Sequence, residues 1–263
     1  LGFAFFLSTF ELVNCVALLY GRALRHKYKL TWGHVLDISN KVVSGVQAVL
    51  SCVAGAVVCL WSCRRDVAHT SHFVSEAYAW FGTAYFFYDI WSMYKVIVGG
   101  SRCSKQTKNN SLQFVSRPRP SFLSYCRHEP LILFHHLFIG GFGFLVIVYL
   151  RGGLGDCVFG TVYLMEISTP FVSARGILSM KQSGLYLYNG LAMLATFFVF
   201  RVLSLPYICL LYSRAVGLPY LQSIGSLPPG CKVSIAILLL PQLYWFFLMG
   251  RGALKVGHRL YQN

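Results

Sequence analysis

The chain has 263 residues, of which 56% are hydrophobic and 12% are charged, and its mean hydropathy is +0.58. Soluble domains carry about 25% charged residues, so this composition excludes an ordinary soluble domain and indicates an integral membrane protein. The net charge of +15 comes from basic residues scattered through loops, so we expect no nucleic-acid partner. The nine cysteines contain no CxxC pair, and we expect neither a disulfide framework nor a zinc knuckle.

Seven stretches are apolar and long enough to cross a bilayer at about 20 residues per crossing. They cover about residues 1–20, 38–61, 77–98, 130–150, 154–174, 185–212 and 232–250. We therefore predict an all-α fold in which residues 1–263 form a single multipass bundle of about seven transmembrane helices. Residues 1–20 lack a basic n-region and hold Glu11, so we interpret them as a membrane helix and not as a signal peptide.

The basic residues favour one orientation of this bundle. With seven crossings, the loops 21–37, 99–129 and 175–184 share a side with the C-terminus, and that side holds fifteen of the 23 Lys and Arg residues, against five on the opposite side. Because cytosolic loops carry an excess of Lys and Arg, we expect a cytosolic C-terminus, a lumenal or external N-terminus, and a long, basic, cytosolic loop 99–129. The sequon at Asn109 lies in that loop, so we expect it to carry no glycan.

Ionisable groups inside apolar helices mark candidate sites, because each costs ~2.5 kcal/mol or more near the bilayer centre. Counting ~1.5 Å per residue from the predicted helix ends, polar side chains of six helices fall in the cytosolic half of the membrane. These residues are His135, His136, Glu166, Asp89, Gln47, Glu11 and Asn189. We therefore expect a polar chamber that opens toward the cytosol.

The adjacent histidines suggest acid–base chemistry in this chamber. A histidine held by Asp89 or Glu166 would have a fixed tautomer and a raised basicity. It could deprotonate an amine or hydroxyl, or attack a thioester itself. Two other interpretations of His135 and His136 stay open: a structural pair, or ligation of a metal together with a carboxylate. No metal-binding spacing accompanies them, so we assign no metal site.

The other charged residues within the crossings also have structural interpretations. Asp156, near the lumenal end of its helix, could serve as an N-cap or first-turn residue as well as a catalytic one. Glu166 could form a polar clamp around a kink at Pro170. Arg201 precedes Pro206, and we expect it to pair with a carboxylate.

A family resemblance rests on His135-His136 and on the downstream run Glu166-Ile167-Ser168-Thr169-Pro170-Phe171. With them the chain resembles the TLC-domain family, the TRAM, Lag and CLN8 group that includes the ceramide synthases. Five more stretches are similar to the branch called TLC domain-containing protein 3: residues 43–48, 85–90, 188–190, 201–207 and 241–246. The resemblance implies a helical bundle around a lipid-accessible cavity.

Two hypotheses about function follow from this resemblance. The first is a ceramide-synthase-like N-acyltransferase of the endoplasmic reticulum, with the Golgi or plasma membrane as alternatives. It would use a fatty acyl-CoA co-substrate, a sphingoid base and no other cofactor. Its catalytic residues would be His135 and His136, oriented by Asp89, Asp156 or Glu166; its substrate-binding residues would be Asn189, Gln47 and Arg201. The second is a non-catalytic lipid-binding protein that tunes membrane composition or another membrane protein such as an ion channel, alone or as a homo- or hetero-oligomer. In the ceramide synthases, a pair of acidic residues on a neighbouring helix follows the two histidines. Asp156 matches the first of them approximately, and the second, an aspartate, has no clear counterpart in this sequence. This difference favours the non-catalytic alternative.

Overall fold

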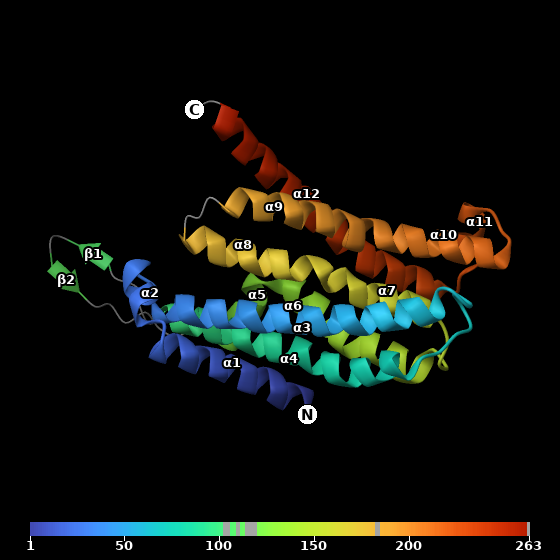
Figure 1. Cartoon of the computed structure of the whole chain (residues 1–263), viewed down its shortest axis with the longest axis horizontal. Helices are drawn as coiled ribbons and strands as arrows, with labels where there is room; N and C mark the ends of the chain where they lie inside the picture. The colour runs from blue at the N-terminus through green and yellow to red at the C-terminus, as the bar shows by residue number, and fades with distance from the viewer. Residues whose placement is uncertain (102–105, 109–110, 114–119, 182–184, 262–263) are drawn as a thin grey trace. The chain divides into compact units, whose positions relative to one another are not determined.

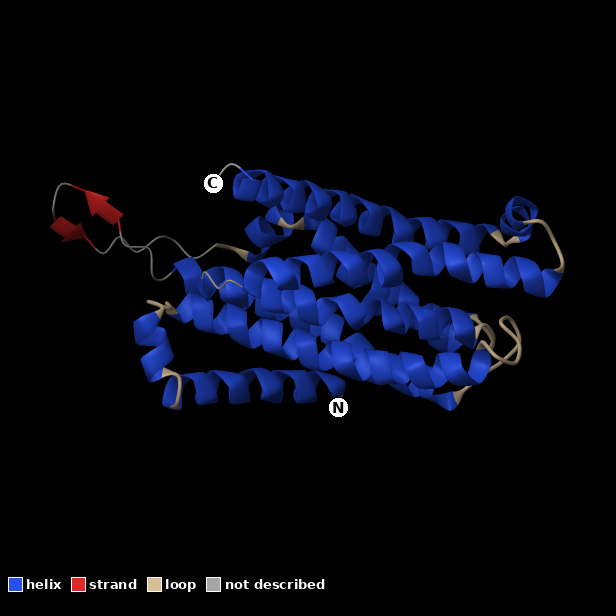
Figure 2. Ribbon diagram, turned by 45° about the horizontal axis from the view of Figure 1, so that its top comes forward, coloured by secondary structure: helices blue, strands red, loops and turns tan. Residues whose placement is uncertain are grey.

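The structure is a computed structural model that describes residues 1–101, 106–108, 111–113, 120–181 and 185–261. Nearly all of the described chain is helical, as Figures 1 and 2 show. Besides short connecting loops, the described chain contains two three-residue strands, β1 (Gln106–Lys108) and β2 (Ser111–Gln113), which pair antiparallel. The predicted all-α class is confirmed.

The first half of the chain contains six helices of very different length. They are α1 (Gly2–Leu19), α2 (Arg22–Lys27), α3 (Trp32–Ser62), α4 (Phe73–Ser101), α5 (Phe122–His128) and α6 (Pro130–Leu137). Helix α6 continues into two π-helical segments, η1 (Phe138–Gly143) and η2 (Val146–Leu150). The loop predicted over 99–129 therefore contains the end of α4, the hairpin and all of α5, while Asn109 lies outside the described residues.

The second half consists of helical stretches with local changes of pitch. They are α7 (Asp156–Leu164), the 3-10 segment η3 (Met165–Ser168), α8 (Thr169–Lys181), α9 (Leu185–Phe197), the π-helical segment η4 (Phe198–Leu203), α10 (Ser204–Val216), α11 (Tyr220–Ser226) and α12 (Pro229–Tyr261). The predicted loop 175–184 is helical as far as Lys181. Figure 1 shows α9 running through η4 into α10 as one continuous rod.

Six helical stretches of the described chain are long and apolar enough to cross a membrane. They are Gly2–Leu19, Trp32–Ser62, Pro130–Leu150, Asp156–Ser179, Leu185–Val216 and Pro229–Lys255. Each overlaps one of the predicted crossings. These six agree with the predicted multipass bundle of about seven helices, and the predicted crossing 77–98 is the one that is not among them.

Helix α4 contains that predicted crossing. It is long enough to cross a membrane, but it is not apolar enough. Its 29 residues span roughly 43 Å, more than the ~30 Å hydrocarbon core requires. Its sequence carries Glu76, Asp89 and Lys95, which lower the mean hydropathy. Asp89 and Ser92 are nonetheless buried within the protein. Burial of this polar face is how a helix of mixed composition is accommodated among apolar ones.

The chain divides into two compact units. The first combines Leu1–Gln47 with Ala79–Val146. Its core contains Phe6 and Phe10 of α1, Leu36 and Val43 of α3, and Tyr85 and Tyr88 of α4. Gly33 and Gly100 let the backbones of α3 and α4 approach closely, since a Cβ on Gly33 would lie 2.8 Å from the Cα of Gly100. Small residues at such crossings are typical of helices packed in membranes.

The second unit combines Ala48–Tyr78 with Ile147–Asn263. Here α3 and α7 approach at a pair of glycines, because a Cβ on Gly55 would lie 2.7 Å from the carbonyl oxygen of Gly160. The hydroxyl of Ser51 donates to the Tyr163 carbonyl across the same contact, at 3.1 Å. The close approach therefore aligns the end of α3 with the start of α7.

A disulfide joins these two helices, contrary to expectation. Cys63 follows the last residue of α3, and Cys157 lies in the first turn of α7. No local pattern indicates the pair, because 94 residues separate the two cysteines and the folded chain brings them together beside the glycine contact.

Candidate functional site

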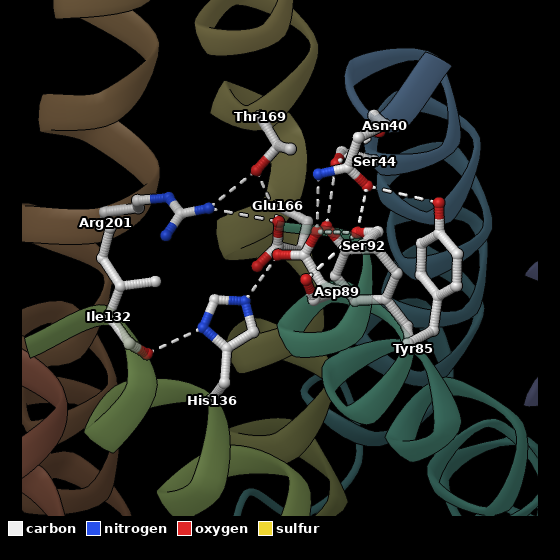
Figure 3. A network of polar contacts seen from close by, with 11 residues as sticks. Asn40, Ser44, Tyr85, Asp89, Ser92, Ile132, His136, Glu166, Thr169 and Arg201 are labelled. Carbon is white, nitrogen blue, oxygen red and sulfur yellow. Dashed lines mark hydrogen bonds and ion pairs between the residues drawn. The ribbon is translucent and has the colours of Figure 1, made fainter. Parts of the chain in front are cut away.

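The first unit contains a buried histidine–carboxylate pair. Nε2 of His136 on α6 lies 2.8 Å from Oδ2 of Asp89 on α4, and their side chains are only 12% and 9% exposed (Figure 3). Gly140 permits this approach of α6 to α4, since a Cβ there would lie 2.9 Å from Cβ of Phe86. The Phe86 ring then packs edge-on against His136.

Asp89 is oriented from its other side by Asn40 of α3. Nδ2 of Asn40 donates to Oδ1 of Asp89 at 2.9 Å, while Oδ1 of Asn40 accepts from the hydroxyls of Ser92 at 2.7 Å and Tyr88 at 3.2 Å. Nearby, Tyr85 donates to Ser44 at 2.9 Å (Figure 3). These contacts fix the amide orientation of Asn40 and leave the carboxylate pointing at His136.

Both ring nitrogens of His136 are engaged. Nδ1 lies 2.8 Å from the carbonyl oxygen of Ile132, which can only accept, so Nδ1 carries a proton. A second proton occupies the Nε2–Oδ2 contact, because a bare nitrogen lone pair facing a carboxylate would be repulsive. The resting pair of His136 and Asp89 therefore already holds a proton to give, and its chemistry is that of an acid.

The neighbouring polar residues of the first unit differ in accessibility. The ring of His135 is half-buried and lies edge-on to that of His136, with 5.9 Å between centroids. Gln47 is buried, with 3% of its surface exposed. Glu11 is exposed on α1 and does not line a protein interior.

The second unit contains a separate cluster around Arg201 of η4. Nη2 donates to Oε2 of Glu166 at 3.1 Å and to the Thr169 hydroxyl at 2.8 Å (Figure 3). Nε donates to the Ser168 hydroxyl at 2.7 Å. Gln242, which follows Pro241 inside α12, accepts from Nη1 at 3.5 Å. Arg201 pairs with a carboxylate as expected, and the Glu166 contacts match the interpretation as a polar clamp.

Asp156 takes part in a third arrangement, also within the second unit. It is fully buried, forms an ion pair with Arg151, and accepts from the backbone N–H of His72. Arg151 also contacts Glu76, at 3.4 Å. Together with the disulfide, these contacts join the first turn of α7 to the loop that follows α3. Asp156 therefore has the structural role in the first turn of a helix that was one of its two interpretations.

Asn189 of α9 forms a hydrogen bond that joins α9 to α8. Its Nδ2 donates to the carbonyl of Phe171 on α8, at 2.8 Å.

Of the predicted site residues, the structure thus joins His136 with Asp89, and Glu166 with Arg201. Asp156 and Asn189 bond to other partners. No group of three or more His, Cys, Asp or Glu side chains suited to a metal occurs in the part of the chain that the structure describes.

Asn40 and Ser92 are the network residues that sequence reasoning missed. The predicted crossing begins at residue 38, so it places Asn40 at the membrane surface, where water can solvate an amide side chain. Helix α3 begins at Trp32 instead, so Asn40 lies more than two turns inside it. Ser92 follows Asp89 by three residues, and that spacing puts both on one helix face.

These long apolar helices, with ionisable groups buried among them, define a multipass integral membrane protein. The model of the TLC domain, described as TRAM_LAG1_CLN8, matches residues 37–251. The chain therefore belongs to the TLC-domain family, whose members include ceramide synthases, TRAM and CLN8 proteins, and its function is a lipid-related one in a membrane. No solved structure matches the chain.

Proposed function

We propose that this protein transfers a fatty acyl group from acyl-CoA to the amine of a long-chain lipid such as a sphingoid base. The observation that carries the proposal is the buried pair of His136 and Asp89, with Nε2 and Oδ2 2.8 Å apart on two helices of a TLC domain. Such a pair holds a transferable proton away from water. Within the family, we assign the chain to the branch of TLC domain-containing protein 3.

The reaction needs one group that takes a proton and one that gives a proton. The amine nitrogen attacks the thioester carbonyl, the C–N bond forms and the C–S bond breaks. His135 takes the proton that the amine loses, and the CoA thiolate receives the proton shared by His136 and Asp89. Asn40 keeps Asp89 aimed at His136, which makes it a positioning residue. Acid and base catalysis of this kind contribute about 10²- to 10⁴-fold each.

Histidine variants test these roles with purified protein in lipid nanodiscs. We expect His135→Ala and His136→Ala each to reduce ceramide formation from palmitoyl-CoA and sphingosine by about 10²-fold or more. The matched control is His69→Ala, because His69 is an exposed histidine that pairs with Asp66 in a loop. If the double variant of His135 and His136 makes ceramide at the wild-type rate, the proposed mechanism is wrong.

The second candidate function is a non-catalytic lipid-binding regulator of membrane composition or of another membrane protein such as an ion channel. One observation favours it: the three buried or half-buried carboxylates Asp89, Asp156 and Glu166 are all bonded to side chains of the protein itself. This candidate predicts that a lipid co-purifies without turnover. It also predicts that the physiological effect survives the loss of both histidines.

For the orientation, we propose a lumenal N-terminus and a cytosolic C-terminus in the endoplasmic reticulum membrane, with α4 as the seventh crossing. Two independent features support this. The charge bias assigns the loop after α3 to the side that is poor in Lys and Arg. The Cys63–Cys157 disulfide lies at that same end of α3 and α7, and disulfides persist in oxidising compartments such as the lumen.

Sealed microsomes test this orientation. A membrane-impermeant reductant should leave the disulfide intact until detergent is added, and maleimide labelling of Cys63 and Cys157 should follow only then. Labelling of these cysteines in sealed vesicles, or a glycan on Asn109, would reverse the assigned sides.

A further inference from the structure

Tyr125 of α5 is a buried tyrosine whose hydroxyl has no hydrogen-bond partner among the residues that the structure describes. Only 2% of its surface is exposed. Other tyrosines of the first unit are bonded: Tyr94 donates to the Pro120 carbonyl at 3.2 Å, and Tyr88 donates to Asn40. A buried phenol normally finds a partner, because leaving the hydroxyl unbonded costs free energy. The hydroxyl of Tyr125 is therefore available to an acceptor that the described part of the chain does not supply.

The surroundings of Tyr125 connect it to the pair of His136 and Asp89. Its ring packs against that of Tyr94, with 6.1 Å between centroids. Tyr94 lies five residues beyond Asp89 on α4, about one and a half turns along the helix. Helix α5 leads directly through Glu129 into α6, which carries His136. Tyr125 thus packs against the helix that carries Asp89, on the segment that leads into the helix of His136.

Electrostatics keep this hydroxyl protonated. Burial, and secondarily the negative charge of nearby Asp89, raise the pKa of Tyr125 to about 12. The phenol is therefore a hydrogen-bond donor throughout the physiological pH range, and never a base. A group that satisfies this O–H is therefore a hydrogen-bond acceptor.

We propose that the Tyr125 hydroxyl donates a hydrogen bond to the acyl carbonyl oxygen of the lipid thioester bound beside His136 and Asp89. The inference rests on the proposed function for its ligand, and adds a binding residue to that site. A thioester carbonyl is an acceptor that enters with the substrate and leaves with the product. The same bond strengthens as negative charge develops on this oxygen during attack by the amine.

Substitution of the hydroxyl alone tests the proposal. Tyr125→Phe keeps the ring contacts with Tyr94 and Phe122, and the matched control Tyr94→Phe removes a neighbouring hydroxyl that is already bonded. Without ligand, we expect the Tm of Tyr125→Phe to equal that of the wild type or to exceed it by about 2–4 °C. We expect Tyr94→Phe to lower Tm by about 2–4 °C. A fall in Tm for Tyr125→Phe as large as that for the control would overturn the proposal, because the hydroxyl would then be bonded within the protein.

Binding of two CoA derivatives provides the second readout. Palmitoyl-CoA has the carbonyl, whereas S-hexadecyl-CoA is a thioether that lacks it. We expect Tyr125→Phe to weaken palmitoyl-CoA binding about tenfold while leaving thioether binding unchanged. Equal changes for the two derivatives, no change for either, or no binding of palmitoyl-CoA to the wild type would each refute the role of Tyr125. Selective weakening without any ceramide formation would refute the proposed transferase activity and leave this carbonyl contact standing.

Discussion

Replacing Asp89 by Asn separates the stability of the buried network from its ability to deliver a proton. The amide oxygen of the new side chain can accept from Nδ2 of Asn40, as Oδ1 of Asp89 does now. Its NH₂ group would face Nε2 of His136, which can accept once His136 is neutral and keeps its proton on Nδ1. Every donor and acceptor of the pair stays bonded, and one proton is lost from the site.

The cost in stability follows from these contacts. Two charge-assisted hydrogen bonds become neutral ones, at about 1 kcal/mol each, and the removal of a buried charge returns part of that loss. We expect a net destabilisation of about 1 kcal/mol for Asp89→Asn, or about 2–4 °C in Tm. Asp89→Ala leaves the donors of His136 and Asn40 without an acceptor, and its cost should be about 3–5 kcal/mol.

The two variants and the wild type are compared by thermal unfolding, followed through tryptophan fluorescence, and by ceramide formation from palmitoyl-CoA and sphingosine. Asp89→Asn should lose about 10²-fold or more of the transfer rate although it unfolds close to the wild-type temperature. The reasoning fails if Asp89→Asn is as unstable as Asp89→Ala, or if it transfers acyl groups at the wild-type rate.

Three further predictions concern the rest of the chain. Arg201→Ala should lower the free energy of unfolding by about 3–5 kcal/mol, because Glu166 is left without its ion-pair partner. In a double-mutant cycle of Tm values, adding Glu166→Ala should recover part of that loss, and simple additivity would contradict the pairing. Replacing Cys63 and Cys157 together by Ser should lower stability by up to about 4 kcal/mol, since the bond closes a loop of about 94 residues, and an unchanged Tm, with or without reductant, would show that the bond does not form. The backbone N–H groups of residues 68 and 69 hold the pKa of Asp66 below its ordinary 3.8, so its contribution to stability is present above pH ~4 and lost as the pH falls through the depressed pKa; the Tm difference between wild type and Asp66→Asn should vanish at low pH, and a difference that grows there would reverse the sign.

The helices were predictable because crossing a membrane requires about 20 apolar residues, and that requirement is visible in one sequence. Six of the predicted crossings overlap helices that are long and apolar enough to span. The exception, α4, has a buried polar face, and its burial depends on packing that composition does not record. The cost of burying charge likewise marked Asp89 and His136 as candidates before their contact was known.

Partnerships were less predictable, because they depend on which helix faces meet. Three carboxylates were candidate partners of the histidines, and only the folded first unit brings Asp89 to His136. A helix boundary drawn six residues late hid Asn40. The disulfide between Cys63 and Cys157 depended on two glycines that align α3 with α7. Each of these contacts joins segments that are 47 or more residues apart, a separation at which local sequence patterns carry no information.

The central claim is that the protein catalyses acyl transfer, and an isotope experiment tests it most directly. Purified wild-type protein in nanodiscs is incubated with deuterated palmitoyl-CoA and sphingosine, and the lipids are analysed by mass spectrometry. The account predicts deuterium-labelled ceramide formed in proportion to protein and time, and its loss in His136→Ala. Labelled palmitoyl-CoA or sphingosine that binds to the protein without yielding labelled ceramide would contradict the claim and support the non-catalytic lipid-binding function.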